Sequence, residues 1–134
     1  MTSRDVRDFL ALYQQVVFLL PPSFVVPQQF AIVTAYNPLG ACLEDEENVR
    51  RNRQLESSFG RISYQPLVGC SLDLSHQEPS FALVCPKSEA IQLARRYDQN
   101  AIYWVEAGRL WLEPVALSFT PIELGPFSDF LATF

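Results

Sequence analysis

Histidine and paired cysteines, the usual ligands of structural zinc, are scarce in this sequence. His76 is the only histidine, and the three cysteines, Cys42, Cys70 and Cys85, form no CxxC pair. A zinc site needs several His or Cys ligands at close spacing, so we expect no metal. An odd number of scattered cysteines favours buried free thiols in a reducing cytosol over a disulfide scaffold.

The motifs of common enzyme and cofactor sites are also missing. The chain has no phosphate-binding Walker loop and no dinucleotide-binding glycine fingerprint. Ser80, His76 and Asp73 supply the residue types of a Ser-His-Asp triad, but no nucleophile elbow surrounds the serine. We therefore expect no cofactor and no serine hydrolase.

Long apolar segments are lacking as well. Residues 16–26 are apolar but too few to span a bilayer, and they include Pro21 and Pro22. Residues 1–8 mix acids with bases and contain no apolar signal-peptide core. These features predict a cytoplasmic protein that does not enter a membrane.

A surplus of basic residues is absent too. The chain carries 10 Lys and Arg against 15 Asp and Glu, a net charge of −5, which makes nucleic acid an unlikely partner because phosphate contacts need surplus positive charge. The local basic cluster is Arg50, Arg51, Arg53 and Arg61. Pairing with Glu46, Glu47 and Glu56 explains most of this cluster.

What the sequence does contain is a globular composition and a regular order of elements. Its 134 residues, 49% of them hydrophobic, predict one domain spanning residues 1–134. Apolar periodicity predicts helices over residues 5–13, 44–59 and 86–97, and strands over 15–20, 30–36, 61–68, 79–85, 101–106 and 109–113. After a short N-terminal helix, this ββα-ββα-ββ order predicts an α+β fold, a mainly antiparallel sheet with two helices on one face.

The C-terminal tail, residues 114–134, combines prolines with large apolar side chains. Pro114, Pro121 and Pro126 break regular structure, while Leu117 and Phe127 are too apolar for a disordered tail. We expect this tail to pack on the body of the domain or on a partner.

Several segments together resemble a small bacterial family, the domain-of-unknown-function family 3293. They are Thr34-Ala35-Tyr36-Asn37-Pro38, the run from Glu47-Asn48 to Leu55, Glu78-Pro79-Ser80-Phe81, and Gln99-Asn100-Ala101. The order and spacing of these segments fit over residues 13–112. The resemblance implies an uncharacterised function and supplies no catalytic roles.

The polar residues of the same segments are the candidate ligand-binding residues: Thr34, Tyr36, Asn37, Asn48, Asn52, Gln99 and Asn100. Asn37 follows a predicted strand, and Asn48 and Asn52 lie on one face of the next predicted helix. Two interpretations remain open. The amides line a pocket for a small polar ligand, or they hold the Asn37 loop against the helix, since buried amides need partners.

Glu78 is the candidate acid–base residue. It directly precedes the predicted strand that begins at Pro79, where burial would raise the pKa of a carboxyl group and suit it to proton transfer. The alternative is a solvated glutamate in a polar loop that includes His76.

Tyr103, Trp104 and Trp111 lie on the predicted hairpin, and they either fill the core or form an exposed aromatic face. An exposed face, or the C-terminal tail, would allow a homodimer. We therefore expect a non-enzymatic module that binds a ligand or a protein through an amide-rich polar pocket. The alternative is a metal-independent hydrolase or transferase that uses Glu78.

Overall fold

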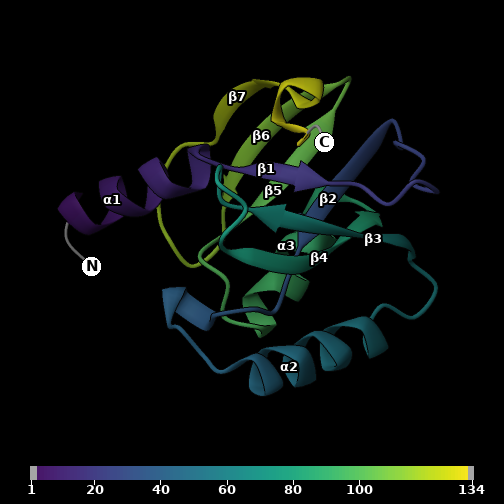
Figure 1. Cartoon of the computed structure of the whole chain (residues 1–134), viewed down its shortest axis with the longest axis horizontal. Helices are drawn as coiled ribbons and strands as arrows, with labels where there is room; N and C mark the ends of the chain where they lie inside the picture. The colour runs from purple at the N-terminus through teal and green to yellow at the C-terminus, as the bar shows by residue number, and fades with distance from the viewer. Residues whose placement is uncertain (1–2, 133–134) are drawn as a thin grey trace.

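The computed structural model describes residues 3–132, with side chains from residue 6 onward (Figure 1). The elements are α1 (Ser3–Gln14), β1 (Val17–Leu19), β2 (Gln29–Val33), η1 (Pro38–Gly40), α2 (Asp45–Ser57), β3 (Ser63–Cys70), β4 (Gln77–Val84), α3 (Lys87–Arg96), β5 (Ala101–Glu106), β6 (Arg109–Pro114), β7 (Ile122–Pro126) and η2 (Phe127–Phe130). The predicted α+β class is confirmed. Among the described residues, no helix is long and apolar enough to cross a membrane. The outermost positions of the predicted domain and tail, 1–2 and 133–134, lie outside this range.

The strands form one antiparallel sheet in the order β1-β3-β4-β2-β5-β6-β7. The sheet curls, and the segment that follows β7 and η2 returns to its other edge: Phe18 of β1 bridges Leu131, and the Phe18 carbonyl accepts the N–H of Ala132 at 3.0 Å. Figure 1 shows this end of the chain next to β1. The curled sheet therefore encloses an interior, as a small barrel does.

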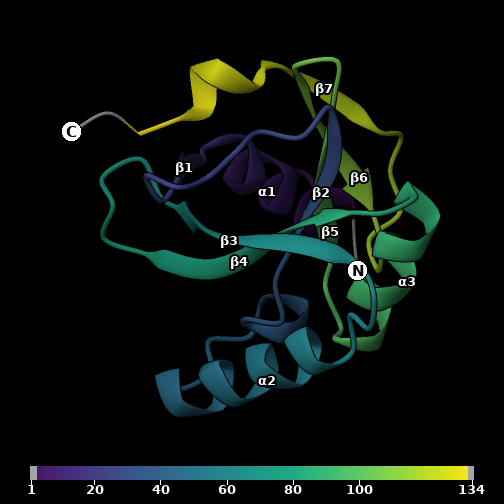
Figure 2. The same cartoon turned by 90° about the vertical axis from the view of Figure 1, so that its right-hand side faces the viewer.

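The convex face of the sheet is covered by α2 and α3 (Figure 2). Ala31 and Val33 of β2 pack there against Leu55 of α2 and Leu93 of α3. The small side chains on this face of β2 allow the helices to pack closely against the strand. Trp104 is buried in the same cluster, so it fills the core.

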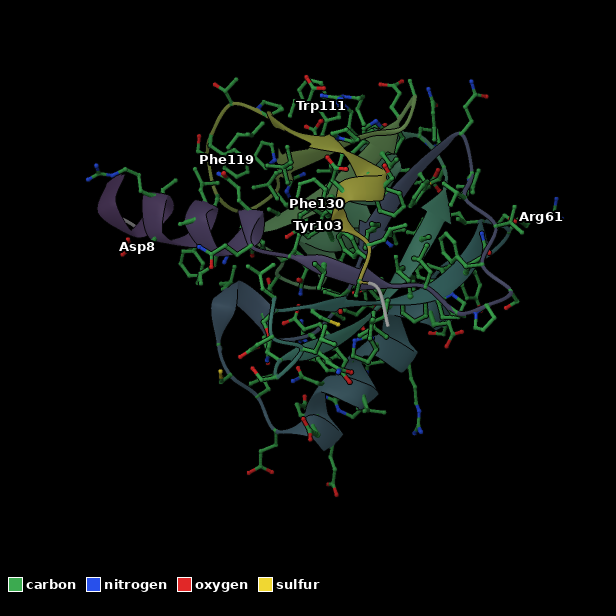
Figure 3. All side chains as sticks on the ribbon, turned by 45° about the horizontal axis from the view of Figure 1, so that its top comes forward. Asp8, Arg61, Tyr103, Trp111, Phe119 and Phe130 are labelled. Atoms are coloured by element: carbon green, nitrogen blue, oxygen red, sulfur yellow. The ribbon has the colours of Figure 1, made fainter. Side chains whose placement is uncertain are left out.

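The enclosed face is filled at one end by aromatic rings. The rings of Phe30 and Phe127 meet edge to face at a centroid distance of 5.5 Å, and Phe18 lies 5.8 Å from Phe127. The C-terminal segment thus fills this end of the interior. β7 is a strand that the sequence pattern did not predict. Tyr103 and Phe130 both pack against this cluster near the centre of Figure 3, whereas Asp8 and Arg61 lie at opposite sides of the molecule.

β2 ends at Val33, three residues before the predicted end at Tyr36. The reason is that α2 replaces the neighbouring strand as the hydrogen-bonding partner of Ala35. The Ala35 N–H donates to Asn52 Oδ1 at 2.8 Å, and the Ala35 carbonyl accepts from Arg51 Nε at 2.8 Å. The chain therefore leaves the sheet at a point that α2 determines.

The predicted ion pairing of the arginine cluster is only partly correct. Glu47 pairs with Arg50 one turn away. Arg51 instead spans two elements, because its Nη2 also donates to the Tyr97 carbonyl at the end of α3 at 2.6 Å. Glu56 accepts from the hydroxyl of Tyr64 at 2.7 Å.

Candidate functional site

The interior that the aromatic rings leave open is a cavity of about 630 Å³ beneath α1. We call it the main cavity. Phe9 and Tyr13 of α1 form one wall, and Phe18, Ile32 and Tyr103 form the walls opposite. A cavity of this size is within the range of roughly 300–1,000 Å³ that is usual for small-molecule sites.

The aromatic part of the main cavity is held in a fixed arrangement. The hydroxyl of Tyr103 donates to the carbonyl of Tyr13 at 2.5 Å and so ties β5 to the end of α1. The Tyr103 ring packs edge to face on Phe18 at a centroid distance of 5.3 Å. Burial raises the pKa of Tyr13 to about 12 and the pKa of Tyr103 well above its ordinary value, so both phenols stay neutral at physiological pH.

The polar part of the main cavity is centred on Glu78, which lies within β4 and not before it. Phe81 faces the helices, and Glu78 and Ser80 lie on the opposite face of β4. Their side chains therefore point into the interior. Glu78 Oε1 accepts from Asn37 Nδ2 at 3.1 Å and lies 3.3 Å from His76 Nε2. Two neighbours therefore orient this half-buried carboxylate.

Asn37 itself is fixed by its backbone and by both ends of its amide. It adopts a left-handed conformation with φ of 48°, which asparagine tolerates better than most residues. Its Oδ1 accepts from the Leu43 N–H at 3.1 Å and from Asn48 Nδ2 at 2.9 Å. The amide of Asn37 is therefore held in the orientation that donates to Glu78.

The side-chain amides of Asn48 and Asn52 are hydrogen-bonded to other residues of the chain. Asn48 Oδ1 accepts from the Asn37 N–H at 2.9 Å, while Asn52 Nδ2 donates to the Pro79 carbonyl at 2.8 Å. Both side chains are buried. These bonds join α2 to the residues that follow β2 and to β4, so α2 indirectly positions Asn37.

Gln99 and Asn100 differ in their surroundings. Gln99 lines the main cavity and donates through Nε2 to the Tyr36 carbonyl at 3.1 Å. Asn100 is buried behind the wall, and neither atom of its amide has a hydrogen-bond partner among the described residues. Its Nδ2 would lie 3.7 Å from a Cβ atom placed on Gly40.

The sequence-predicted site residues therefore converge only in part. The main cavity is lined by Thr34, Tyr36, Asn37, Glu78 and Gln99. Asn48 lines a smaller adjoining cavity of about 440 Å³, together with Tyr36, Asn37 and His76. Asn52 and Asn100 line neither cavity. Thr34 is already bonded through its hydroxyl to the Pro79 carbonyl at 2.8 Å.

Sequence reasoning missed the partnership of His76 with Glu78. His76 directly precedes β4 and lies two positions before Glu78, and that spacing in extended chain was the available signal. The Ser-His-Asp triad that the residue types alone would allow does not form, because the Asp73 carboxylate accepts hydrogen bonds from Ser71 and Ser75 instead. The contribution of α1 to the cavity wall was not predicted either, because the residues that α1 contacts there lie far away in the sequence.

The prediction of buried thiols is wrong for Cys42, which is exposed and lines the main cavity. Cys70 is buried as expected, and Cys85 is half-buried. Cys42 follows η1, where the chain passes over the surface between β2 and α2.

A family model described as "Protein of unknown function (DUF3293)" matches residues 33–102, which is more than half of the chain. The chain belongs to DUF3293. The matched DUF3293 segment runs from the end of β2 into β5 and contains every predicted site residue, whereas α1 and β6 lie outside it. No curated protein and no solved structure matches this DUF3293 chain.

Proposed function

We propose that this DUF3293 domain binds a small organic molecule in the main cavity. The observation that carries this proposal is the cavity itself, in which aromatic walls face one oriented carboxylate. Ligand sites commonly combine apolar walls with a few fixed polar groups that set the orientation of the ligand. A small molecule fits this concave interior better than a protein partner does.

In this proposal, the side-chain amides of Asn48 and Asn37 mainly hold other residues in position. Asn48 fixes Asn37, and Asn37 in turn fixes Glu78, so the ligand meets a carboxylate whose position is set before binding. A fixed polar group loses little freedom when the ligand binds, which favours affinity. Gln99 and Tyr36 complete the polar wall.

The test uses 2-phenylethanol as a neutral aromatic probe and backbone-amide NMR shifts as the readout. We expect shifts confined to residues of the main cavity and saturation at millimolar probe. Ser80→Leu adds a side chain inside the cavity and should weaken binding at least about tenfold. Ser88→Leu makes the same change on the exposed first turn of α3 and should leave the shifts intact.

Thermal melting of both variants establishes that they are folded. If Ser80→Leu does not fold, Ala101→Leu repeats the test from β5, which lines the same cavity. Shifts scattered over the surface, or binding unaffected by filling the cavity, would refute the proposal.

A second candidate function is a metal-independent hydrolase or transferase. The observation that favours it is the pairing of Glu78 with His76, since a carboxylate beside an imidazole can take a proton from water or from an acceptor hydroxyl. Asn37 then serves as the orienting group. This candidate predicts that Glu78→Gln abolishes turnover of p-nitrophenyl esters or phosphates, while Tm changes by less than about 2 °C. Equal rates for the wild type and Glu78→Gln would eliminate it.

A homodimer through the aromatic hairpin has less surface available than the sequence suggested, because Trp104 is buried. Trp111 remains half-buried at the edge of the helix-side cluster, and Figure 3 shows it at the periphery. Sedimentation of the wild type beside Trp111→Ala tests this assembly. A wild-type monomer would exclude it.

A further inference from the structure

The formal charges on the walls of the main cavity are negative. Asp73 and Glu78 contribute the two carboxylates, and His76 is the only basic side chain among the described residues that line it. Such a cavity repels carboxylate and phosphate ligands and attracts cations, because interactions between charges are strengthened where water is partly excluded.

Asp73 remains ionised throughout the physiological range. Its Oδ1 accepts from the hydroxyl of Ser75 at 2.7 Å, from the Ser75 N–H at 3.0 Å and from the hydroxyl of Ser71 at 2.8 Å. These bonds, chiefly those from Ser75, lower the pKa of Asp73 to about 2. The hairpin between β3 and β4 therefore presents a permanent anion at one side of the cavity.

The charge of Glu78 contributes, after burial, to the raised pKa values of three tyrosines around the cavity. The pKa values of Tyr13, Tyr36 and Tyr103 are all raised, chiefly by burial and in each case also by the charge of Glu78. These tyrosines come from α1, from the loop after β2 and from β5. A cation placed among them would meet a favourable field from that carboxylate.

The aromatic walls suit the same kind of ligand. Because the Tyr103 hydroxyl is bonded to the Tyr13 carbonyl, Tyr103 offers its ring to a ligand and not its hydroxyl. The faces of tyrosine and phenylalanine rings attract ammonium groups, because the ring faces carry partial negative charge. Ile32 and Phe9 supply apolar surface for the remainder of the molecule.

We propose that the main cavity selects an organic ammonium ion, an amine with an apolar or aromatic body whose charged nitrogen lies against Glu78. This inference rests on the proposed function of small-molecule binding and specifies its ligand class. A bare metal ion is disfavoured, because the described residues place no three His, Cys, Asp or Glu side chains together as ligands.

The test compares three probes that share a phenyl ring and a short arm: 2-phenylethylamine, 2-phenylethanol and phenylacetate. Titrations followed by NMR at pH 7 and low salt give a Kd for each. We expect the amine to bind at least about tenfold more tightly than the alcohol, and phenylacetate to bind more weakly than either. Raising the salt concentration should weaken binding of the amine more than binding of the alcohol.

Glu78→Gln separates the charge from the shape of the cavity. It should reduce the affinity for 2-phenylethylamine about tenfold and the affinity for 2-phenylethanol by a clearly smaller factor, because glutamine keeps an oxygen acceptor for the hydroxyl but not the charge. Glu46→Gln removes one negative charge from the exposed surface of α2 and should leave both affinities unchanged. Asp73→Asn should weaken binding of the amine by a smaller factor, because Asp73 lies in the hairpin and not beside the orienting amide of Asn37.

The outcomes distinguish the two proposals. Equal affinities for amine and alcohol would overturn the ammonium inference and leave the ligand-binding function standing, as would tighter binding of phenylacetate. If none of the three probes binds in the cavity, both proposals fail. An equal loss of amine affinity in Glu78→Gln and Glu46→Gln would show a general charge effect and would also refute the assignment of Glu78.

Discussion

The two sides of β2 differ in how their polar groups are satisfied. On the convex side, the amides of Asn48 and Asn52 are buried and bonded to backbone groups of the loop and of β4. On the enclosed side, Glu78 is half-buried and faces an open cavity, with two neighbours at only one of its oxygens. Asn37, in the loop after β2, thus connects a completed network on one side to an incomplete one on the other.

This difference separates structural polar residues from binding ones. A polar side chain whose donors and acceptors are all used contributes to stability, and its removal exposes unpaired groups. A carboxylate with unused acceptor capacity beside a cavity contributes little to stability and can interact with a ligand. The convex side should therefore respond to mutation mainly in stability, and the enclosed side mainly in binding.

The largest effect is expected from the double change Asn48→Ala with Asn52→Ala. It leaves the N–H groups of Ala35 and Asn37 without their partners and removes one of the two donors to the Pro79 carbonyl, so the free energy of unfolding should fall by about 4 kcal/mol. Urea denaturation measures this loss. Gln54→Ala, on the exposed face of the same helix, is the control and should change stability by less than about 0.5 kcal/mol.

A double variant no less stable than the Gln54→Ala control would contradict the proposed difference between the two sides of β2. The amides of α2 would then have no structural role, and their place in ligand binding would have to be reconsidered.

An intermediate effect is expected from Gly40→Ala compared with Gly60→Ala. Both glycines have positive φ, 83° and 59°, and each alanine pays about 1–2 kcal/mol for that conformation. A Cβ on Gly60 meets nothing within 4 Å, whereas one on Gly40 lies 2.7 Å from the Phe9 ring. Gly40→Ala should therefore cost about 1 kcal/mol more, because the ring must shift.

The shifted Phe9 ring should also reduce the affinity of the cavity for 2-phenylethanol. Urea denaturation and NMR titration of both variants provide the two readouts. Identical behaviour of the two glycine variants would show that α1 does not close the cavity through Phe9.

The smallest effect on stability concerns the thiols. Cys42 is exposed at the cavity, while burial, with the charge of Glu89, raises the pKa of Cys85 to about 11. At pH 8 a disulfide reagent should modify Cys42 first and Cys85 slowly, because only the thiolate reacts. Between pH 9 and 11 the thiol of Cys85 ionises in the unfolded chain but stays protonated in the folded one, so its contribution to stability falls as pH rises through that window.

Mass spectrometry after timed labelling identifies the modified cysteine. Bound 2-phenylethylamine should slow the modification of Cys42 and leave Cys85 unaffected. Faster modification of Cys85 than of Cys42 would contradict the burial that the structure assigns to the two residues.

Local chemistry explains which features could be predicted from the sequence. Ala31, Val33 and Ala35 alternate with larger side chains, a pattern that indicates the face of the strand that a helix can cover. The acidic first turn of α2 and Gly60 are local signals for the approximate bounds of that helix. The turn at Ala107 and Gly108, both with positive φ, was predicted in its observed place. These signals depend on residues that are close together in the chain.

The candidate site was harder to predict because it depends on distant contacts. The wall formed by Phe9 and Tyr13 exists only because α1 folds over β5, and no periodicity within α1 indicates that position. β7 is short, lies next to Pro121 and ends at Pro126, and its pairing with β6 contains a register shift. Such features hide a strand from pattern analysis.

The contact that closes the sheet has a consequence for the order of events during synthesis. Phe18 and Ala132 are separated by roughly a hundred positions, and contacts of such long range form late because the entropy of loop closure must be overcome first. While a ribosome is still making the chain, β1 has no partner at that edge. The interior, and any ligand it holds, can therefore be enclosed only after the segment around Leu131 has emerged, long after β1 itself has been synthesised.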